Sequence, residues 1–205
     1  MISDRGVLML GDLGSAHSAH SLVLRPTAEI TTEYARSPER LLGEIRSTTA
    51  IDVWAVGVVA ACLALGHCPW MMGLDDRSPV HRVFEPLYTL LGPVTATCWP
   101  GIESLPNWPQ LQADSLASRV QPVHDEYPGF FEERLMALKP FAGGPDSVAV
   151  RTASAAMRWC PAIRPTADDL ALMTQTLREP APLMPPPKRQ RQAAQSWSSV
   201  THVGN

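Results

Sequence analysis

Residues 49–65 read TAIDVWAVGVVAACLAL, and this stretch decides the fold. Apolar side chains stand at nearly every position, so they cover almost every face of a helix over residues 50–65. Gly66 follows at the position where a glycine commonly ends a helix. The stretch is shorter than the ~20 apolar residues that a membrane span requires, and it carries Asp52. We therefore expect a central, buried helix of a globular domain.

Asp52 is the one charged residue of this stretch, and two roles for it are open. Its carboxylate can compensate the helix dipole from the first turn. Alternatively, it can accept hydrogen bonds from the backbone of another segment, because a buried carboxylate without donors is costly.

The bulk composition predicts one domain followed by a tail. The chain has 205 residues, of which 45% are hydrophobic, and its net charge is -3. Domains that bind nucleic acid usually carry a basic surface, so we expect no nucleic-acid partner, and no membrane association either. None of the four cysteines forms a CxxC pair, which argues against a zinc site. We expect reduced cysteines in an intracellular protein of the nucleus, the cytoplasm or both.

Weaker patterns predict the elements around the central helix. The apolar run Val7–Leu10 lies between turn residues and is typical of a strand. An amphipathic pattern predicts a helix over residues 80–91, which Pro86 should kink or split. Three more helices are expected, over residues 130–138, 147–158 and 166–177. Thr166 is expected to cap the last of them.

The C-terminal residues 179–205 are rich in proline and then polar, which predicts a disordered tail. This tail carries a charge of +3 from residue 180 onward, because it contains three basic residues and no acidic one, and the remaining chain carries -6. The stretch over residues 185–191, PPPKRQR, is compatible with a nuclear-import signal, a polyproline ligand or a solvated tail without a partner.

Five segments follow one another in an order that is found in one family of enzymes. They are Gly11-Asp12-Leu13-Gly14, Ser37-Pro38-Glu39, the helix start over residues 49–57, Trp99-Pro100-Gly101-Ile102 with Leu105-Pro106, and Arg164-Pro165-Thr166-Ala167. In this order and spacing they resemble the catalytic domain of eukaryotic protein kinases. The segment over residues 99–106 resembles the insert of the cyclin-dependent class, which belongs to the CMGC group.

This resemblance implies a mainly α fold, the C-terminal kinase lobe. A helical bundle would surround the buried central helix, with a short β-hairpin remnant at the N-terminus. Residues 1–178 would form a partial kinase domain, truncated before the metal-binding motif, and 179–205 the tail. The activation segment would cover residues 12–39 and the insert residues 92–145 approximately.

The resemblance also implies cofactors and site residues. Asp12 matches the residue that holds Mg²⁺ against the phosphates of ATP, and a hard cation prefers such carboxylate oxygens. Thr27, five residues before Thr32, matches the activating phosphothreonine, whose phosphate orders the segment through arginines. Thr32 and Arg36 match the part of the activation segment that faces the substrate. Tyr34-Ala35 departs from the usual Trp-Tyr there, so proline-directed substrate choice does not follow.

Three further residues would be structural. Glu39 and Arg164 match the partners of the buried ion pair of the family, which is costly to break from one side. Asp52 matches the residue that binds the backbone of the catalytic loop, which is the second of its two open roles.

The implied reaction is the phosphorylation of serine or threonine in a protein substrate, with a cyclin-like or small accessory subunit as a possible partner. The sequence contains no His-Arg-Asp catalytic loop, so no catalytic residue is present. We therefore expect that the chain alone is inactive. The alternatives are a non-catalytic pseudokinase remnant that acts as a protein-binding module, and an unrelated α-helical domain.

Overall fold

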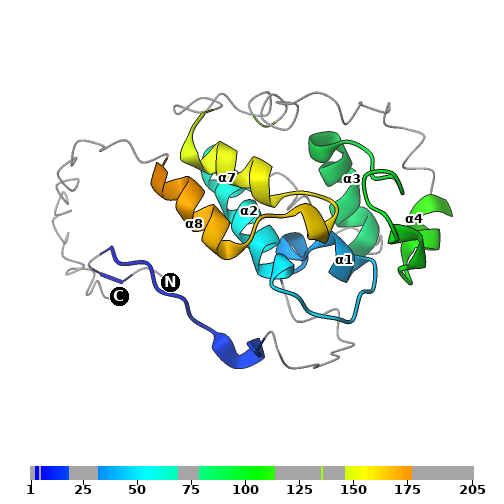
Figure 1. Ribbon diagram of the computed structural model, residues 1–205, viewed down its shortest axis with the longest axis horizontal. Coiled ribbons are helices and arrows are strands. Elements are labelled where there is room, and N and C mark those ends of the chain that lie inside the picture. Colours follow the sequence, from blue (N-terminus) through cyan, green and yellow to red (C-terminus); the bar gives the residue numbers. More distant parts are fainter. Residues whose placement is uncertain are drawn as a thin grey trace, which may run out of the picture.

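The computed structural model describes residues 3, 4, 6–18, 32–68, 79–113, 135 and 146–176. These residues form a mainly helical lobe, which confirms the expected fold class (Figure 1). Three expectations lie outside the described residues: the phosphorylation site Thr27, the tail over 179–205, and the helix over 130–138 apart from Leu135.

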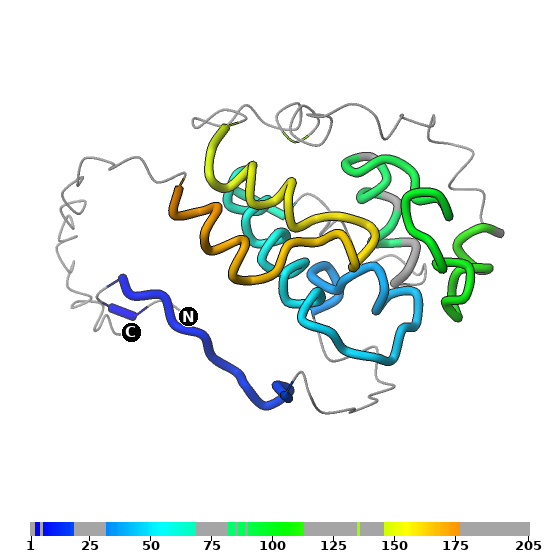
Figure 2. Tube along the Cα trace, in the orientation of Figure 1, coloured from blue at the N-terminus to red at the C-terminus, as the bar shows by residue number. Residues whose placement is uncertain are grey.

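Helix α2 (Ala50–Leu65) is the central element, with the bounds that the sequence predicts. Figures 1 and 2 show α7 (Val148–Ala156) and α8 (Ala167–Thr176) along one side of α2, and α3 (Pro79–Leu91) at one end of the lobe. The other described elements are η1 (Leu13–Ser15), η2 (Glu33–Ala35), α1 (Pro38–Leu41), η3 (Ile102–Ser104), α4 (Trp108–Ala113) and η4 (Pro161–Ile163).

Gly57 sets how closely α2 and α7 approach. A Cβ atom at this position would lie 2.7 Å from Cγ of Met157 and 2.9 Å from Cβ of Ala156. Both distances are shorter than van der Waals contact, so the helices meet this closely only because residue 57 has no side chain. Met157 and Ala156, which make this contact with α2, are fully buried in the core.

An aromatic cluster joins α3 to the segment after α7. Phe84 stacks on Trp159 with ring centroids 5.3 Å apart, and Tyr88 meets the two rings edge-on at 5.9 and 5.6 Å. Trp159 donates its indole N–H to the carbonyl of Gly92 at 3.2 Å. Burial raises the pKa of Tyr88 above its ordinary range. Pro86 lies inside α3, which runs unbroken through it, so the expected split of this helix is wrong.

Asn107 ties the segment after α3 to the end of α1. Its side chain donates to the carbonyl of Leu41 at 2.9 Å, and its backbone N–H donates to the carbonyl of Leu42 at 3.0 Å. Gly43 packs beside this clamp with a φ of 91°, and a Cβ atom there would lie 3.1 Å from Pro106. The start of the expected insert is therefore part of the lobe and is held by hydrogen bonds.

Thr166 caps helix α8, as expected. Its hydroxyl accepts the backbone N–H of Asp169 at 3.1 Å, and its own N–H and hydroxyl donate to Oδ2 of Asp169 at 3.0 and 2.7 Å. This reciprocal arrangement is a capping box. The hydrogen bond from the Thr166 side chain, and then that from its backbone, lower the pKa of Asp169.

The burial of α2 is one-sided, which corrects the expectation of complete burial. Val56, Val59 and Leu63 are 49%, 58% and 67% exposed. Together with the exposed Asp52 they are spaced by four, three and four residues, so they form one face of the helix. We call these four residues the α2 stripe. Within the described part of the chain, packing covers only the opposite face.

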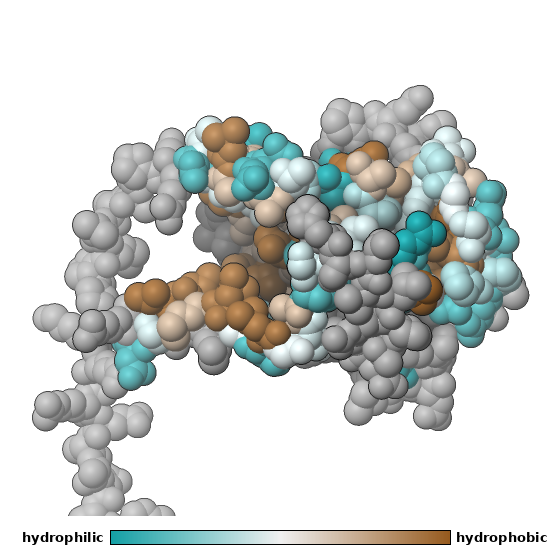
Figure 3. All heavy atoms as spheres, turned by 60° about the horizontal axis from the view of Figure 1, so that its bottom comes forward, coloured by the Kyte–Doolittle hydropathy of each residue, from teal (hydrophilic) through white to brown (hydrophobic). Residues whose placement is uncertain are grey.

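The N-terminal residues 6–18 run as an arm outside the helical lobe (Figure 2). Ser3 and Gly6 form a tight turn, and Leu8 is a single bridge position, so the expected strand and hairpin are not formed by the described residues. The apolar side chains of residues 7–10 are exposed, and they colour this arm brown in Figure 3. None of the described helices is long and apolar enough to span a bilayer.

Replacing Gly57 by alanine should destabilise the lobe. The new methyl group must push α2 and α7 apart, at a cost of about 1–3 kcal/mol in the free energy of unfolding, which exceeds the gain in helix propensity. Urea unfolding followed by circular dichroism measures this change. Gly14→Ala is the matched control, because its Cβ would meet only Asp12 at 3.8 Å. Equal stability of the two variants would contradict the close packing.

Replacing Thr166 by valine should raise the pKa of Asp169 toward its ordinary value, because the hydroxyl donor is lost. Since the folded pKa of Asp169 is lowered, its stabilising effect is present above the unfolded pKa and is lost as the pH falls through the folded pKa. A ¹³C carboxyl titration by NMR measures the pKa. Thr174→Val removes a hydroxyl that bonds only the Ala171 carbonyl, and it should leave Asp169 unchanged.

Candidate functional site

The segment over residues 32–42 carries three of the seven site residues that the sequence indicates, Thr32, Arg36 and Glu39. It contains η2 and then α1, which begins at Pro38, a residue suited to a first helical turn. Arg36 is 8% exposed, Ser37 is 2% exposed and Glu39 is 4% exposed, whereas Thr32 is exposed. The segment therefore turns from solvent into the core within a few residues.

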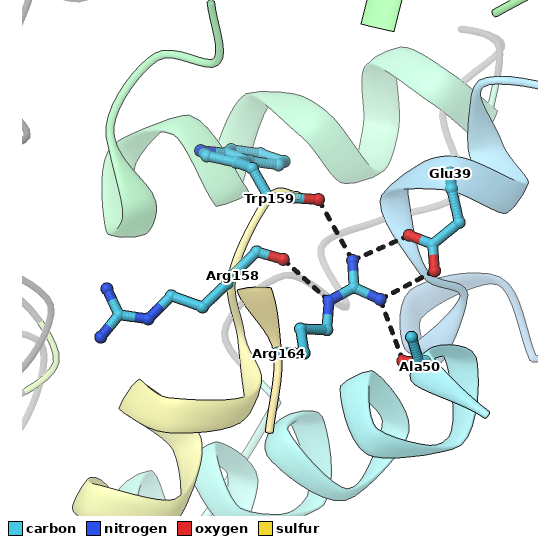
Figure 4. Close-up of polar contacts among 5 residues, drawn as sticks. All are labelled: Glu39, Ala50, Arg158, Trp159 and Arg164. Carbon is cyan, nitrogen blue, oxygen red and sulfur yellow. Dashed lines mark hydrogen bonds and ion pairs between the residues drawn. The ribbon is translucent and has the colours of Figure 1, made fainter. Parts of the chain in front are cut away.

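Arg164 holds this segment in place. Its guanidinium donates to both carboxylate oxygens of Glu39, from Nη1 at 2.7 Å and from Nη2 at 2.8 Å (Figure 4). It also donates to three backbone carbonyls, those of Arg158 at 2.9 Å, Ala50 at 2.9 Å and Trp159 at 3.2 Å. These bonds use all five N–H donors of an arginine.

The surroundings of this ion pair exclude water. The side chain of Arg164 is 0% exposed and that of Glu39 is 5% exposed. The guanidinium also lies over the ring of Trp54, 5.0 Å from its centroid, which adds a cation–π contact. One side chain thus joins α1, the first residue of α2 and the segment that leads to α8. Glu39 and Arg164, which the sequence singled out, are 125 positions apart in the chain, and the structure brings them together.

A second ion pair ties the same segment to α3. Arg82 donates from Nε to Oε1 and from Nη2 to Oε2 of Glu33, both at 2.9 Å. This two-pronged geometry suits arginine, and the side chains are 20% and 37% exposed. Sequence reasoning missed this pair, because no local pattern links residues 49 positions apart that are both ordinary surface types.

Three buried polar groups of the lobe lack a hydrogen-bond partner among the described residues. The hydroxyl of Ser37, the indole N–H of Trp54 and the hydroxyl of Thr152 have no hydrogen-bond partner among the described residues. Buried polar groups are usually paired, so each of these costs stability. Arg40, next to Glu39, donates to the carbonyl of Glu44 at 2.6 Å and so fastens the turn after α1.

Asp12 lies far along the chain from this cluster, in the N-terminal arm. It has a φ of 60°, in the left-handed region that few residues other than glycine adopt, and it is exposed. Magnesium requires six ligands, and one carboxylate supplies at most two of them. No group of three or more metal-ligand side chains occurs within the described residues. The residues present there do not assemble the expected magnesium site.

Asp52 stands in the first turn of α2, at one end of the α2 stripe. It is exposed, and its carboxylate accepts no hydrogen bond from the described residues. Its position fits compensation of the helix dipole, the first of its two roles. Asp52 is exposed because no described segment lies over the stripe, and its second role, binding the backbone of the catalytic loop, stays a prediction.

The family model of the protein kinase domain matches residues 1–171. The chain belongs to the protein kinase family. The curated relatives include cyclin-dependent kinase 7 of Xenopus laevis, 37% identical over 108 residues, which are 53% of this chain and 29% of the relative. Cyclin-dependent kinase 10 of Bos taurus is 34% identical over 126 residues, 61% of this chain and 32% of the relative. The expected likeness to cyclin-dependent kinases of the CMGC group is confirmed.

Solved kinase structures share the fold. The CAK complex from Chaetomium thermophilum bound to ATP-γ-S matches with a TM-score of 0.56 at 24% identity, over 82% of this chain and 46% of that one. The yeast RNA Pol II CTD kinase CTDK-1 complex matches with a TM-score of 0.62 at 21% identity, over 88% and 53%. This kinase chain therefore spans about a third of the length of its curated relatives and about half of the solved chains.

Breaking the buried ion pair should lower the free energy of unfolding of the lobe far more than breaking an exposed pair. Glu39→Gln leaves the Arg164 charge buried without its partner, and a loss of about 3–5 kcal/mol in the free energy of unfolding is expected. Arg164→Lys keeps the charge but loses the planar five-donor fork, so a similar loss is expected. Urea unfolding measures both.

The matched control is Arg46→Lys. Arg46 lies 3.7 Å from Glu44 in an ion pair whose arginine side chain is 77% exposed, so a change of about 1 kcal/mol or less is expected. If Arg164→Lys were no more harmful than Arg46→Lys, the dependence of the lobe on the Arg164 fork would be refuted.

Proposed function

We propose that this chain is the substrate-side part of a cyclin-dependent-like Ser/Thr protein kinase, and that the complete domain transfers the γ-phosphate of ATP to a protein hydroxyl. The observation that carries the proposal is the fastening of residues 32–42 by Arg164 and by Arg82. Phosphoryl transfer depends chiefly on positioning, and a segment held at both ends provides it.

We assign residues of this segment to the substrate. Thr32 is exposed just before η2, whereas Arg36 is buried four residues further on. The exposure of Thr32 supports contact with a substrate backbone, and the burial of Arg36 supports a role in holding the segment from within. Phosphorylation of Thr27 would add negative charge upstream of this anchored part, so that arginines of the complete domain could order it.

ATP and Mg²⁺ belong to the proposal only for the complete domain. Asp12 would supply a carboxylate ligand, and magnesium would neutralise phosphate charge once bound. The described residues contain no group of three or more metal-ligand side chains that could complete a magnesium site, and the sequence contains no His-Arg-Asp loop. We therefore assign no catalytic step to this chain alone and expect it to be inactive.

The alternative is a non-catalytic kinase remnant that binds protein partners. The α2 stripe favours it, because an exposed apolar helix face is suited to contact another protein. The solved structures above are structures of complexes, which supports a cyclin-like or small accessory subunit as the partner in either case.

The purified 205-residue chain should not transfer radiolabelled phosphate from Mg²⁺-ATP to a library of Ser/Thr peptides. The expected signal equals that of the Asp12→Ala variant and of a blank without protein. Activity that requires magnesium and disappears in Asp12→Ala would refute the inactivity of the isolated chain.

A chimera separates the kinase from the remnant. The N-terminal lobe and catalytic loop of a cyclin-dependent kinase are fused upstream of Met1, and phosphate transfer is measured with the cyclin of that kinase. Activity that is lost on Asp12→Asn supports the kinase. A folded, ATP-binding chimera without activity would favour the remnant, with Glu39 and Arg164 serving only the fold.

A further inference from the structure

Two apolar surfaces of the described residues stand open to solvent. One is the α2 stripe, whose three apolar side chains are 49% to 67% exposed. The other is on the N-terminal arm, where four consecutive side chains are 45% to 95% exposed, those of Val7, Leu8, Met9 and Leu10 (Figure 3). Because both surfaces are open in the same structure, the arm of this chain does not cover its own stripe. The kinase reaction proposed above gives the apolar residues of the arm no role.

The two surfaces have matching lengths. From Val56 to Leu63 the helix rises by about 10 Å, at ~1.5 Å per residue. Residues 7–10 form no helix, and an extended backbone also covers about 10 Å over these residues, at ~3.3 Å per residue. Leu8 and Leu10 are the two most exposed side chains of the arm, and side chains two apart lie on the same side of an extended segment. These two leucines can therefore pack side by side along the stripe.

Neither surface carries a charge at its centre. Residues 6–11 read GVLMLG, between Arg5 and Asp12. On the stripe, Asp52 stands at one end, one helical turn before Val56. Charged groups at the rim of an interface stay in water, whereas charges at its core must lose their hydration. The arm can therefore cover the apolar part of the stripe without burying a charge.

The exposed area is that of a stable dimer when two copies exchange their arms. Burying an aliphatic side chain removes roughly 100 Å² of apolar surface from water, so the seven partly exposed side chains would bury roughly 450 Å² at one arm–stripe interface. A two-fold exchange doubles this area, and because about 60% of an interface is apolar, the total comes to roughly 1,500 Å². Stable interfaces bury about 1,200–2,000 Å², a range that one arm–stripe interface alone does not reach.

We propose that the N-terminal arm of one copy of this chain covers the α2 stripe of a second copy, so that two chains form a two-fold symmetric dimer by exchanging arms. The partner is a second copy of this chain, and the recognition is apolar. Such an exchange closes on itself and leaves neither surface open. The proposal does not rest on the kinase function, because it uses no residue of the segment over 32–42.

The exchange would complete the burial that the sequence of α2 predicts. Apolar residues on nearly every face of this helix are typical of a buried element, and α7 packs against α2 within one chain. The arm of the second copy would cover the stripe, while Asp52 would stay at the rim in water.

Analytical ultracentrifugation of the purified full chain tests the proposal. The expected result is a reversible dimer, with twice the chain mass of 22.3 kDa. Leu10→Asp in the arm and Val59→Asp in the stripe should each raise the dissociation constant by about tenfold or more, because each puts a carboxylate into both interfaces. Leu172→Asp is the matched control, since Leu172 is 62% exposed on α8, outside both surfaces. This variant should form dimers as the wild type does.

A mixture of the two variants identifies which surfaces pair. In a mixed dimer, the intact arm of the Val59→Asp chain meets the intact stripe of the Leu10→Asp chain, and the other interface carries both substitutions. The mixture should therefore contain more dimer than either variant alone at the same total concentration. A fluorescent label on one of the two chains shows that this dimer contains both.

Several results would overturn the proposal. A monomeric wild type would mean that the arm covers its own stripe or that both surfaces stay open. A dimer that survives Leu10→Asp would mean that two stripes pair with each other, and equal loss in Leu172→Asp would indicate unspecific aggregation. If circular dichroism shows that Val59→Asp does not fold, Leu10→Asp decides alone, because residue 10 lies outside the helical lobe (Figure 2).

Discussion

The buried guanidinium of Arg164 is the interaction on which the lobe depends. It donates five hydrogen bonds, to Glu39 and to three backbone carbonyls, with its side chain fully buried. A buried charge is tolerated only when every donor is paired, and here the five bonds reach three different parts of the chain. The fork therefore converts three loosely connected pieces, α1, the start of α2 and the segment before α8, into one body (Figure 4).

The same fork links stability to the proposed function. Tyr34 packs partly buried against the core, Leu41 and Leu42 are buried, and ion pairs hold both ends of residues 32–42. Arg164 fixes its C-terminal end from inside the core, and Arg82 fixes its N-terminal end at the surface through Glu33. Since an exposed pair contributes little and a buried pair is costly to break from one side, the inner end is the more firmly held one. A substrate would meet the outer end, near Thr32.

One face of helix α2 is not covered by the described residues. Its sequence is apolar on almost every face, yet packing against α7 covers one side and leaves the α2 stripe in solvent. The carboxylate of Asp52 likewise stands in the first helical turn without a donor from the described residues.

The sequence by itself determined the elements whose signals are local. The bounds of α2, its end at Gly66 and the cap at Thr166 follow from residue types and spacing. The pairing of Glu39 with Arg164 was implied by the resemblance to the kinase family. The tertiary structure alone decided which face of α2 is covered, that Pro86 does not split α3 and that Glu33 meets Arg82. Hydrophobic period and capping act within a few residues, whereas burial and long-range contacts depend on which surfaces the folded chain brings together.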